Sequence, residues 1–190
     1  DESSLAGGTI SLDGSGLNTT GGGSITLASG RIGISDSRLA GGDIQLTALQ
    51  EVALDNSRID GNLSYLSADS IFADEAVSID VAALSAVGRV LDFSGAEIVV
   101  GTGAAPMASD FGLLEELGEQ VPALLPASLS PNASFNASES LALASLGGTA
   151  HYIVLRAPTA SLPGLGSISG ASDVFLQYTP TANDEDFTFP

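Results

Sequence analysis

Acidic and amide side chains recur in the polar bends of this sequence, at a spacing that could place them side by side. Asp36, Asn56 and Glu75 take the same place in three bends, and Asp55 and Asp74 form a neighbouring pair. Carboxylates stacked about 5 Å apart could bind calcium, which prefers oxygen ligands. They could also provide the acid and the base of an enzyme that cleaves polysaccharides.

The same bends have a simpler interpretation as solvated turns. The calcium-binding repeat G-G-x-G-x-D is absent, and serine and asparagine alternate with the acids, as is typical of turns. Clustered acids alone do not establish a site. We therefore predict no catalytic, cofactor-binding or metal-binding residue in this chain, and no cofactor.

Two arginines follow the bends in matching positions. Arg38 and Arg58 are equivalent, and Glu97 takes the corresponding place in a later bend. Stacked guanidinium groups could clamp a substrate carboxylate, or they could pair with neighbouring aspartates. We expect the second arrangement, because exposed ion pairs of this kind are common and contribute little.

Other side chains with possible chemistry are few. His151 is the single histidine, no G-x-S-x-G motif accompanies it, and cysteine is absent. A serine-histidine hydrolase and a typical zinc site are both disfavoured by this composition. Tryptophan is absent too, so Tyr65, Tyr152 and Tyr178 are the tyrosines on which a sugar ring could stack.

The elements that would position these residues follow an apolar pattern that repeats from Ile32 to Val100. Four copies of one phrase start 20, 19 and 20 residues apart. A step of this length with two short alternating strands fits one coil of a parallel β-helix, in which equivalent side chains form columns. We predict an all-β fold, a right-handed parallel β-helix with about 20 residues per coil. The copies are Ile32-Gly33-Ile34 with Leu39, Val52-Ala53-Leu54 with Ile59, Ile71-Phe72-Ala73 with Ile79, and Leu91-Asp92-Phe93 with Ile98.

Small residues mark the corner of each coil. Ser37, Ser57, Ala76 and Ala96 fall in one column at the bend. A narrow corner admits little else, so we expect these four side chains to be buried together.

The first coil is predicted from a local match of letters. Residues 2–12 copy residues 36–46 position for position, so the strand at Ile10 should correspond to Ile44-Gln45-Leu46. On this register, residues 13–23 form a shortened coil.

The pattern divides the chain into three parts. Residues 1–100 form regular coils, and residues 138–190 form further irregular coils with a C-terminal tail. Residues 101–137 break the repeat and are predicted to be an insertion outside the β-helix. The apolar spacing of Phe111, Leu113, Leu114 and Leu117 predicts a short helix within this insertion.

The charge of the chain excludes several classes of partner. It carries 23 Asp and Glu residues against 5 arginines and no lysine, a formal net charge of -18. Nucleic acid and anionic membranes attract clustered cations, so we predict neither as a partner. No apolar run approaches the roughly 18 residues of a membrane span, so we predict no membrane insertion.

One stretch resembles a known repeat. Residues 39–46, Leu-Ala-Gly-Gly-Asp-Ile-Gln-Leu, followed by residues 52–61, Val-Ala-Leu-Asp-Asn-Ser-Arg-Ile-Asp-Gly, resemble the repeat of filamentous haemagglutinin-like exoproteins. These are large bacterial adhesins exported by two-partner secretion. The resemblance covers residues 1–100. It implies a secreted or cell-surface β-helical shaft, an outer-membrane transporter as partner of the full-length protein, and roles in cell adhesion, biofilm formation and virulence.

We therefore expect a fragment of a secreted bacterial surface adhesin rather than an enzyme. Its partner would be a host-cell receptor or an extracellular polysaccharide. The alternative is a β-helical polysaccharide hydrolase or lyase. Three or more Asp, Glu or Arg side chains meeting on one concave face would favour the enzyme, and scattered turn acids would favour the adhesin.

Overall fold

The computed structural model describes residues 8–20, 22–74, 76–101, 133–148, 152–161 and 173–178. Every regular element among these residues is a β-strand, and all strand pairs are parallel. The strands are β1 (Thr9–Asp13), β2 (Gly16–Asn18), β3 (Ile25–Ser35), β4 (Arg38–Ala40), β5 (Asp43–Asp55), β6 (Arg58–Ser67), β7 (Ser70–Ala73), β8 (Ser78–Val100), β9 (Ala133–Gly148), β10 (Tyr152–Ala157), β11 (Thr159–Ser161) and β12 (Asp173–Tyr178).

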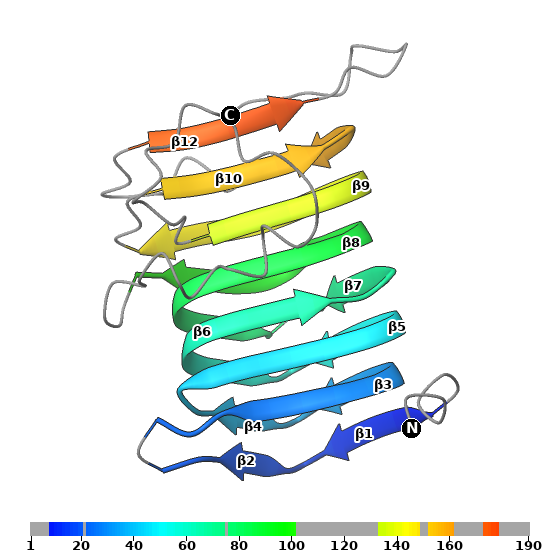
Figure 1. The fold of residues 1–190 in the computed structure, drawn as a ribbon, viewed down its shortest axis with the longest axis vertical. Coiled ribbons are helices and arrows are strands. Elements are labelled where there is room, and N and C mark those ends of the chain that lie inside the picture. Colours follow the sequence, from blue (N-terminus) through cyan, green and yellow to red (C-terminus); the bar gives the residue numbers. More distant parts are fainter. Residues whose placement is uncertain are drawn as a thin grey trace.

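The strands wind into a β-solenoid of about six turns with roughly 20 residues per turn, which confirms the predicted parallel β-helix. Figure 1 shows the coils stacked along the long axis, with β1 and β2 at one end and β12 at the other. The described part of the chain contains no helix that could cross a lipid bilayer. Residues 102–132, with the predicted short helix, lie outside the described residues.

The predicted columns form the core. Val52 pairs with Ile32 on one side and with Ile71 on the other, and Ile71 pairs in turn with Leu91. These side chains are at most 1% exposed. The side chains of the other two columns are at most 3% exposed. They comprise Ile34, Leu54, Ala73 and Phe93, and Leu39, Ile59, Ile79 and Ile98.

The stack continues across the predicted insertion. Leu91 of β8 pairs with Leu141 of β9, so two residues 50 positions apart in sequence are neighbours. The rings of Phe93 and Phe135 meet edge to face at 5.5 Å between centroids. Coiling resumes at Ala133, earlier than the predicted boundary at residue 138, because Ala133, Phe135 and Ala137 alternate into the core.

The predicted register of the first coil is wrong. Ile10 pairs with Ile32 rather than with Ile44, and Leu17 pairs with Leu39. The spacing of Ile10, Leu12 and Leu17 equals that of the inward residues of the next coil, so this register turns all three side chains towards the core. The prediction relied on the similarity between residues 2–12 and residues 36–46. That similarity includes residues that point outwards, and such residues do not determine the register.

Placing a carboxylate in a core column should unfold the array. Leu54 is 1% exposed, so Leu54→Asp would bury an unpaired charge at a cost of several kcal/mol. Ala53→Asp is the matched control, because the neighbouring side chain points to the opposite face of the strand. Circular dichroism with thermal unfolding should show a folded Ala53→Asp protein and an unfolded Leu54→Asp protein. A cooperatively folded Leu54→Asp protein would contradict the register.

Candidate functional site

The polar bends stack with a shared backbone conformation. Gly14, Asp36, Asn56 and Ala76 all have positive φ angles, of 56°, 46°, 41° and 65°. Glycine adopts this region freely, and Asp and Asn tolerate it better than most residues. The register of the flanking strands places these four residues one above another. The bends therefore form one continuous edge of the solenoid.

This geometry corrects the predicted column of Asp36, Asn56 and Glu75. The third bend is one residue longer than its neighbours, and Ala76 takes the place equivalent to Asn56. Glu75 itself lies outside the described residues. The neighbouring pair is confirmed in part, since the Asp74 N–H donates to the Leu54 carbonyl and so places Asp74 beside Asp55; both side chains are exposed.

The corner column is also shifted at the third bend. Ser37, Ser57 and Ala96 are buried as predicted, whereas Ala76 is exposed. Val77, 2% exposed, fills the corner in its place. The extra residue in this bend moves the inward position by one.

The buried serines form a hydrogen-bonded ladder between bends. The Ser57 hydroxyl donates to the Asp55 carbonyl at 2.6 Å and accepts the Ser37 backbone N–H at 3.3 Å. The Ser37 hydroxyl repeats the arrangement, donating to Ser35 at 2.6 Å and accepting the Ser15 N–H at 3.0 Å. Each serine therefore satisfies a polar group of its own bend and one of the preceding bend.

The two arginines pair with aspartates, as predicted. Arg38 and Arg58 lie in register, and their Nε atoms contact the two carboxylate oxygens of Asp60 at 2.7 Å and 2.6 Å. Arg58 also lies 3.8 Å from Asp80 through Nη2. The hydrogen bond to Asp60, with the charges of both aspartates, raises the pKa of the Arg58 guanidinium.

Glu97 occupies the matching place in a later bend. Its N–H donates to the Val77 carbonyl, just as the Ser78 N–H donates to Ser57 and the Arg58 N–H donates to Ser37. The prediction that Glu97 stands in the arginine column is confirmed.

A shallow hollow of about 410 Å³ opens beside these residues. Asn56 Nδ2 donates to Asp36 Oδ1 at 2.5 Å across it. The hollow therefore presents guanidinium donors next to amide and carboxylate acceptors. Its lining comprises Ser15, Asp36, Ser37, Arg38, Asn56, Ser57, Arg58, Ala76 and Ser78.

The described acids do not assemble a metal centre. No group of three or more His, Asp or Glu side chains within the described ranges could hold a metal ion. Among the described residues, the lining of the hollow at the bends contains one carboxylate, Asp36, beside two arginines. Asp36, Arg38 and Arg58 are the three charged side chains on one concave face that we expected of an enzyme. A glycosidase, however, requires a pair of carboxylates.

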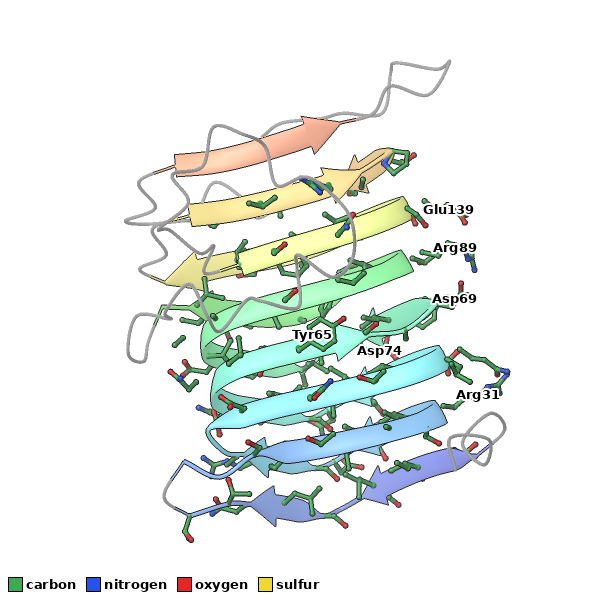
Figure 2. The ribbon with its side chains drawn as sticks, in the orientation of Figure 1. Arg31, Tyr65, Asp69, Asp74, Arg89 and Glu139 are labelled. Carbon is green, nitrogen blue, oxygen red and sulfur yellow. The ribbon has the colours of Figure 1, made fainter. Side chains whose placement is uncertain are left out.

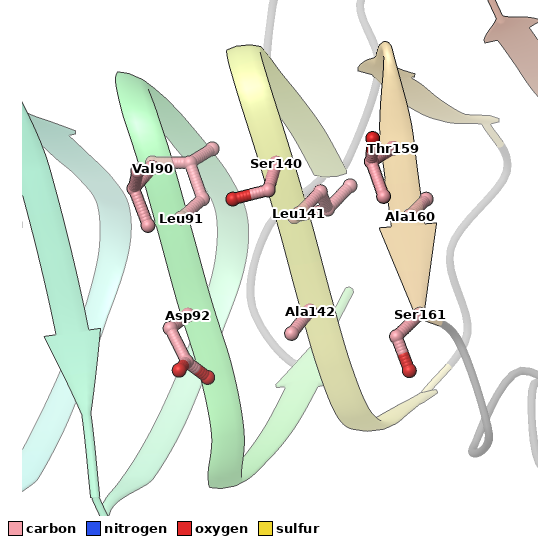
Figure 3. Close-up of a pocket in the computed structure, with 9 residues that line it drawn as sticks. All are labelled: Val90, Leu91, Asp92, Ser140, Leu141, Ala142, Thr159, Ala160 and Ser161. Carbon is pink, nitrogen blue, oxygen red and sulfur yellow. The ribbon is translucent and has the colours of Figure 1, made fainter. Parts of the chain in front are cut away.

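A second hollow, of about 340 Å³, lies where β8, β9 and β11 stack (Figure 3). Asp92 is the single ionisable side chain among its described lining residues, and Asp92 Oδ1 accepts the Ser94 N–H at 3.0 Å. One capped carboxylate with surrounding hydroxyl groups provides no acid and base pair. The lining comprises Val90, Leu91, Asp92, Ser140, Leu141, Ala142, Thr159, Ala160 and Ser161.

An ionic clamp joins three coils at another corner. Arg89 contacts Asp69 at 3.1 Å and also pairs with Glu139. Figure 2 shows the three side chains in a row along the stack. The hydrogen bond from Arg89 lowers the pKa of the Asp69 carboxyl, and the bonds to both acids raise the pKa of Arg89.

Several residues in these clusters were missed by sequence reasoning. Asp60 and Asp80 follow the repeat two positions after Arg58 and Ser78, so alternation along a strand could have found them. Asp69 and Arg89 are one coil apart, but Glu139 lies 50 residues beyond Arg89. Because this separation is far longer than one coil, the repeat could not predict that Glu139 pairs with Arg89.

The tyrosines contribute to neither hollow. Tyr65 is partly buried on β6 and lines neither cavity. His151 and the side chains of Tyr152 and Tyr178 lie outside the described residues. The sugar-stacking hypothesis therefore has no observed support from Tyr65.

Comparisons with protein-family models, curated proteins and solved structures found no match for this chain. The fold places it in the class of parallel β-solenoid proteins, which contains both enzymes and proteins without catalytic activity. Its function must therefore be argued from its own surface.

Removing one rung of the serine ladder should destabilise the fold. Ser57→Ala leaves the buried Ser37 N–H without its acceptor, at a cost of about 1 to 3 kcal/mol. Ser67→Ala is the control, because Ser67 is partly exposed and makes no side-chain hydrogen bond within the described residues. Urea unfolding of both variants measures the difference. Equal free energies of unfolding would argue against the ladder.

The clamp at Asp69 should make stability depend on pH. Because the folded-state pKa is lowered, the stabilisation is complete above the unfolded-state pKa of about 4 and is lost as the pH falls through the folded-state value. Asp69→Asn should lower the melting temperature at pH 7. Asp43→Asn is the control and should lower it less, because the Asp43 carboxylate forms no ion pair with any described residue. The gap should close as the pH falls below the folded-state pKa of Asp69. A gap that is independent of pH would contradict the clamp.

Proposed function

We propose that this chain is a shaft or binding module of a secreted bacterial surface adhesin. The observation that carries the proposal is the stack of parallel coils from β1 to β12, which continues on both sides of a long interruption in the sequence. A fold of this kind makes an extended body that needs no disulfide or metal, and its bends are free to present side chains to a partner.

The ion pairs and hydrogen bonds between neighbouring coils, among the described residues, support a structural and binding role. Arg38, Arg58 and Arg89 each pair with an acid on a neighbouring coil, Arg58 through its 3.8 Å contact with Asp80. The bend serines hold one coil to the next. Most of the side chains that could have formed a catalytic site therefore hold neighbouring coils together instead. The resemblance of residues 39–61 to repeats of filamentous haemagglutinin-like exoproteins points the same way.

In this proposal the partner is a host-cell receptor or an extracellular polysaccharide. The protein acts outside the cell or on its surface, and the full-length protein is exported through an outer-membrane transporter. The formal charge of -18 keeps copies of the protein apart and makes anionic partners unfavourable.

A β-helical polysaccharide hydrolase or lyase is the second candidate. It is favoured by the concave site at the bends, where Asp36, Arg38 and Arg58 line one hollow. Against it stands the lack of a second carboxylate among the described residues of that lining. A lyase would need a base beside the substrate in addition to an arginine, and Asp36 is the one carboxylate that the described lining offers for this role.

An attachment assay with product analysis separates the two functions. Beads coated with the purified chain are incubated with cells and with immobilised polysaccharides, and the solution is analysed for new reducing ends and unsaturated sugars. We expect attachment above that of beads coated with the unfolded Leu54→Asp variant, without chain shortening. Release of shortened chains would support the enzyme. Attachment equal to that of the unfolded control would overturn the adhesin proposal.

A further inference from the structure

The hollow at the bends offers unused hydrogen-bonding capacity. Arg38 is 63% exposed and donates through Nε to Asp60, while its terminal nitrogens make no hydrogen bond with any described residue. Asn56 uses Nδ2 to hold Asp36, and its side-chain carbonyl has no donor among the described residues. Donors and acceptors therefore alternate along one concave surface.

The charge balance of this surface narrows the class of ligand. Asp60 bridges both arginines and Asp80 lies beside the second, so the positive charges are already compensated. Asp36 adds a further negative charge in a chain of net charge -18. An anion is disfavoured by the acids, and a simple cation by the two guanidinium groups. A neutral molecule with many hydroxyl groups can use both kinds of partner.

Small residues flank the two arginines along the stack. The strand register places Gly16 next to Arg38 on one side and Ser78 next to Arg58 on the other. Adjacent coils are about 4.8 Å apart, a step comparable with the length of one sugar ring in an extended chain. A linear saccharide lying along the stack would meet Arg38 and Arg58 with successive rings.

We propose that the hollow lined by Asp36, Arg38, Asn56 and Arg58 binds a short segment of a neutral polysaccharide. Ring hydroxyls donate to the Asp36 carboxylate and the Asn56 carbonyl and accept from the terminal N–H groups of the arginines. The inference rests on the proposed adhesin function and specifies its ligand. The site binds saccharide without cleaving it, because the described residues of its lining include a single carboxylate.

The test uses defined probes and matched variants. Cellohexaose and the hexamer of N-acetylglucosamine are the neutral probes, and hyaluronan and heparin hexamers are the anionic ones. Arg38→Ala removes a donor from the hollow, and Arg31→Ala removes the same charge from an exposed arginine that bonds Gln50 elsewhere. Asn56→Gly deletes the amide while keeping the backbone conformation, as Gly14 does in the first bend.

We expect the wild-type chain to bind at least one neutral probe in calorimetric titration. Loss of a hydrogen bond from a charged group should weaken binding at least about tenfold in Arg38→Ala. Asn56→Gly should also weaken it, and Arg31→Ala should not. Thermal unfolding of each variant establishes that it is folded.

Three results would overturn the site. They are equal binding by Arg38→Ala and Arg31→Ala, preference for the anionic hexamers, and no binding of either neutral probe by the wild-type chain. The bead-attachment assay is run in parallel on the same preparations. Beads that attach to cells while neither neutral probe binds would leave the adhesin proposal standing and remove only its assigned ligand.

Discussion

Each coil of this protein can satisfy its backbone only by lying in register on the coil before it. The strands are all parallel neighbours, so the N–H and C=O groups of one coil are partnered by those of the next. A shift of one residue would turn the column of Val52 and Ile71 outwards. Backbone pairing and core burial therefore impose the same register, and neither a metal nor a disulfide is needed to fix it.

The surface chemistry follows from that constraint. Once coils are in register, outward side chains must also stack, so Arg38 faces Arg58 and Asp60 faces Asp80 on neighbouring coils. Ion pairs offset these like charges, because Asp60 contacts both Arg38 and Arg58. At another corner, Arg89 contacts both Asp69 and Glu139. At the corners, the buried bend serines link neighbouring coils by accepting backbone N–H groups of the preceding bend. The hollow at the bends lies along this edge, where Arg38 and Arg58 stand among smaller lining residues.

The fold was predictable because inward residues carry a strict period. Ile32, Val52 and Ile71 recur on the coil length, and burial gives such positions little freedom. The predicted register of the first coil is wrong because it follows local sequence similarity to residues 36–46. The spacing of the inward residues Ile10 and Leu12 indicates the observed register instead. At the third bend, one additional residue shifted the whole turn, so Ala76 took the position assigned to Glu75.

The site was predictable only in part, because it depends on outward side chains. The stacking of Arg38 on Arg58 and their pairing with aspartate followed from the repeat. The bridging geometry of Asp60 and the concavity between the bends depend on rotamers and on local side-chain size, which the period does not determine. The clamp to Glu139 was hidden by the long interruption between β8 and β9.

Cross-linking across that interruption tests the stacked register most directly. The chain has no cysteine, so paired cysteines can be introduced at Val87 and Asn136, which lie opposite each other on β8 and β9. Adjacent parallel strands bring such residues within disulfide range, whereas Ser67 and Asn136 are two coils apart. Mild oxidation of the folded protein should cross-link the first pair and leave the second pair reduced. A cross-link at Ser67 and Asn136, or none at Val87 and Asn136, would contradict the continuous stack.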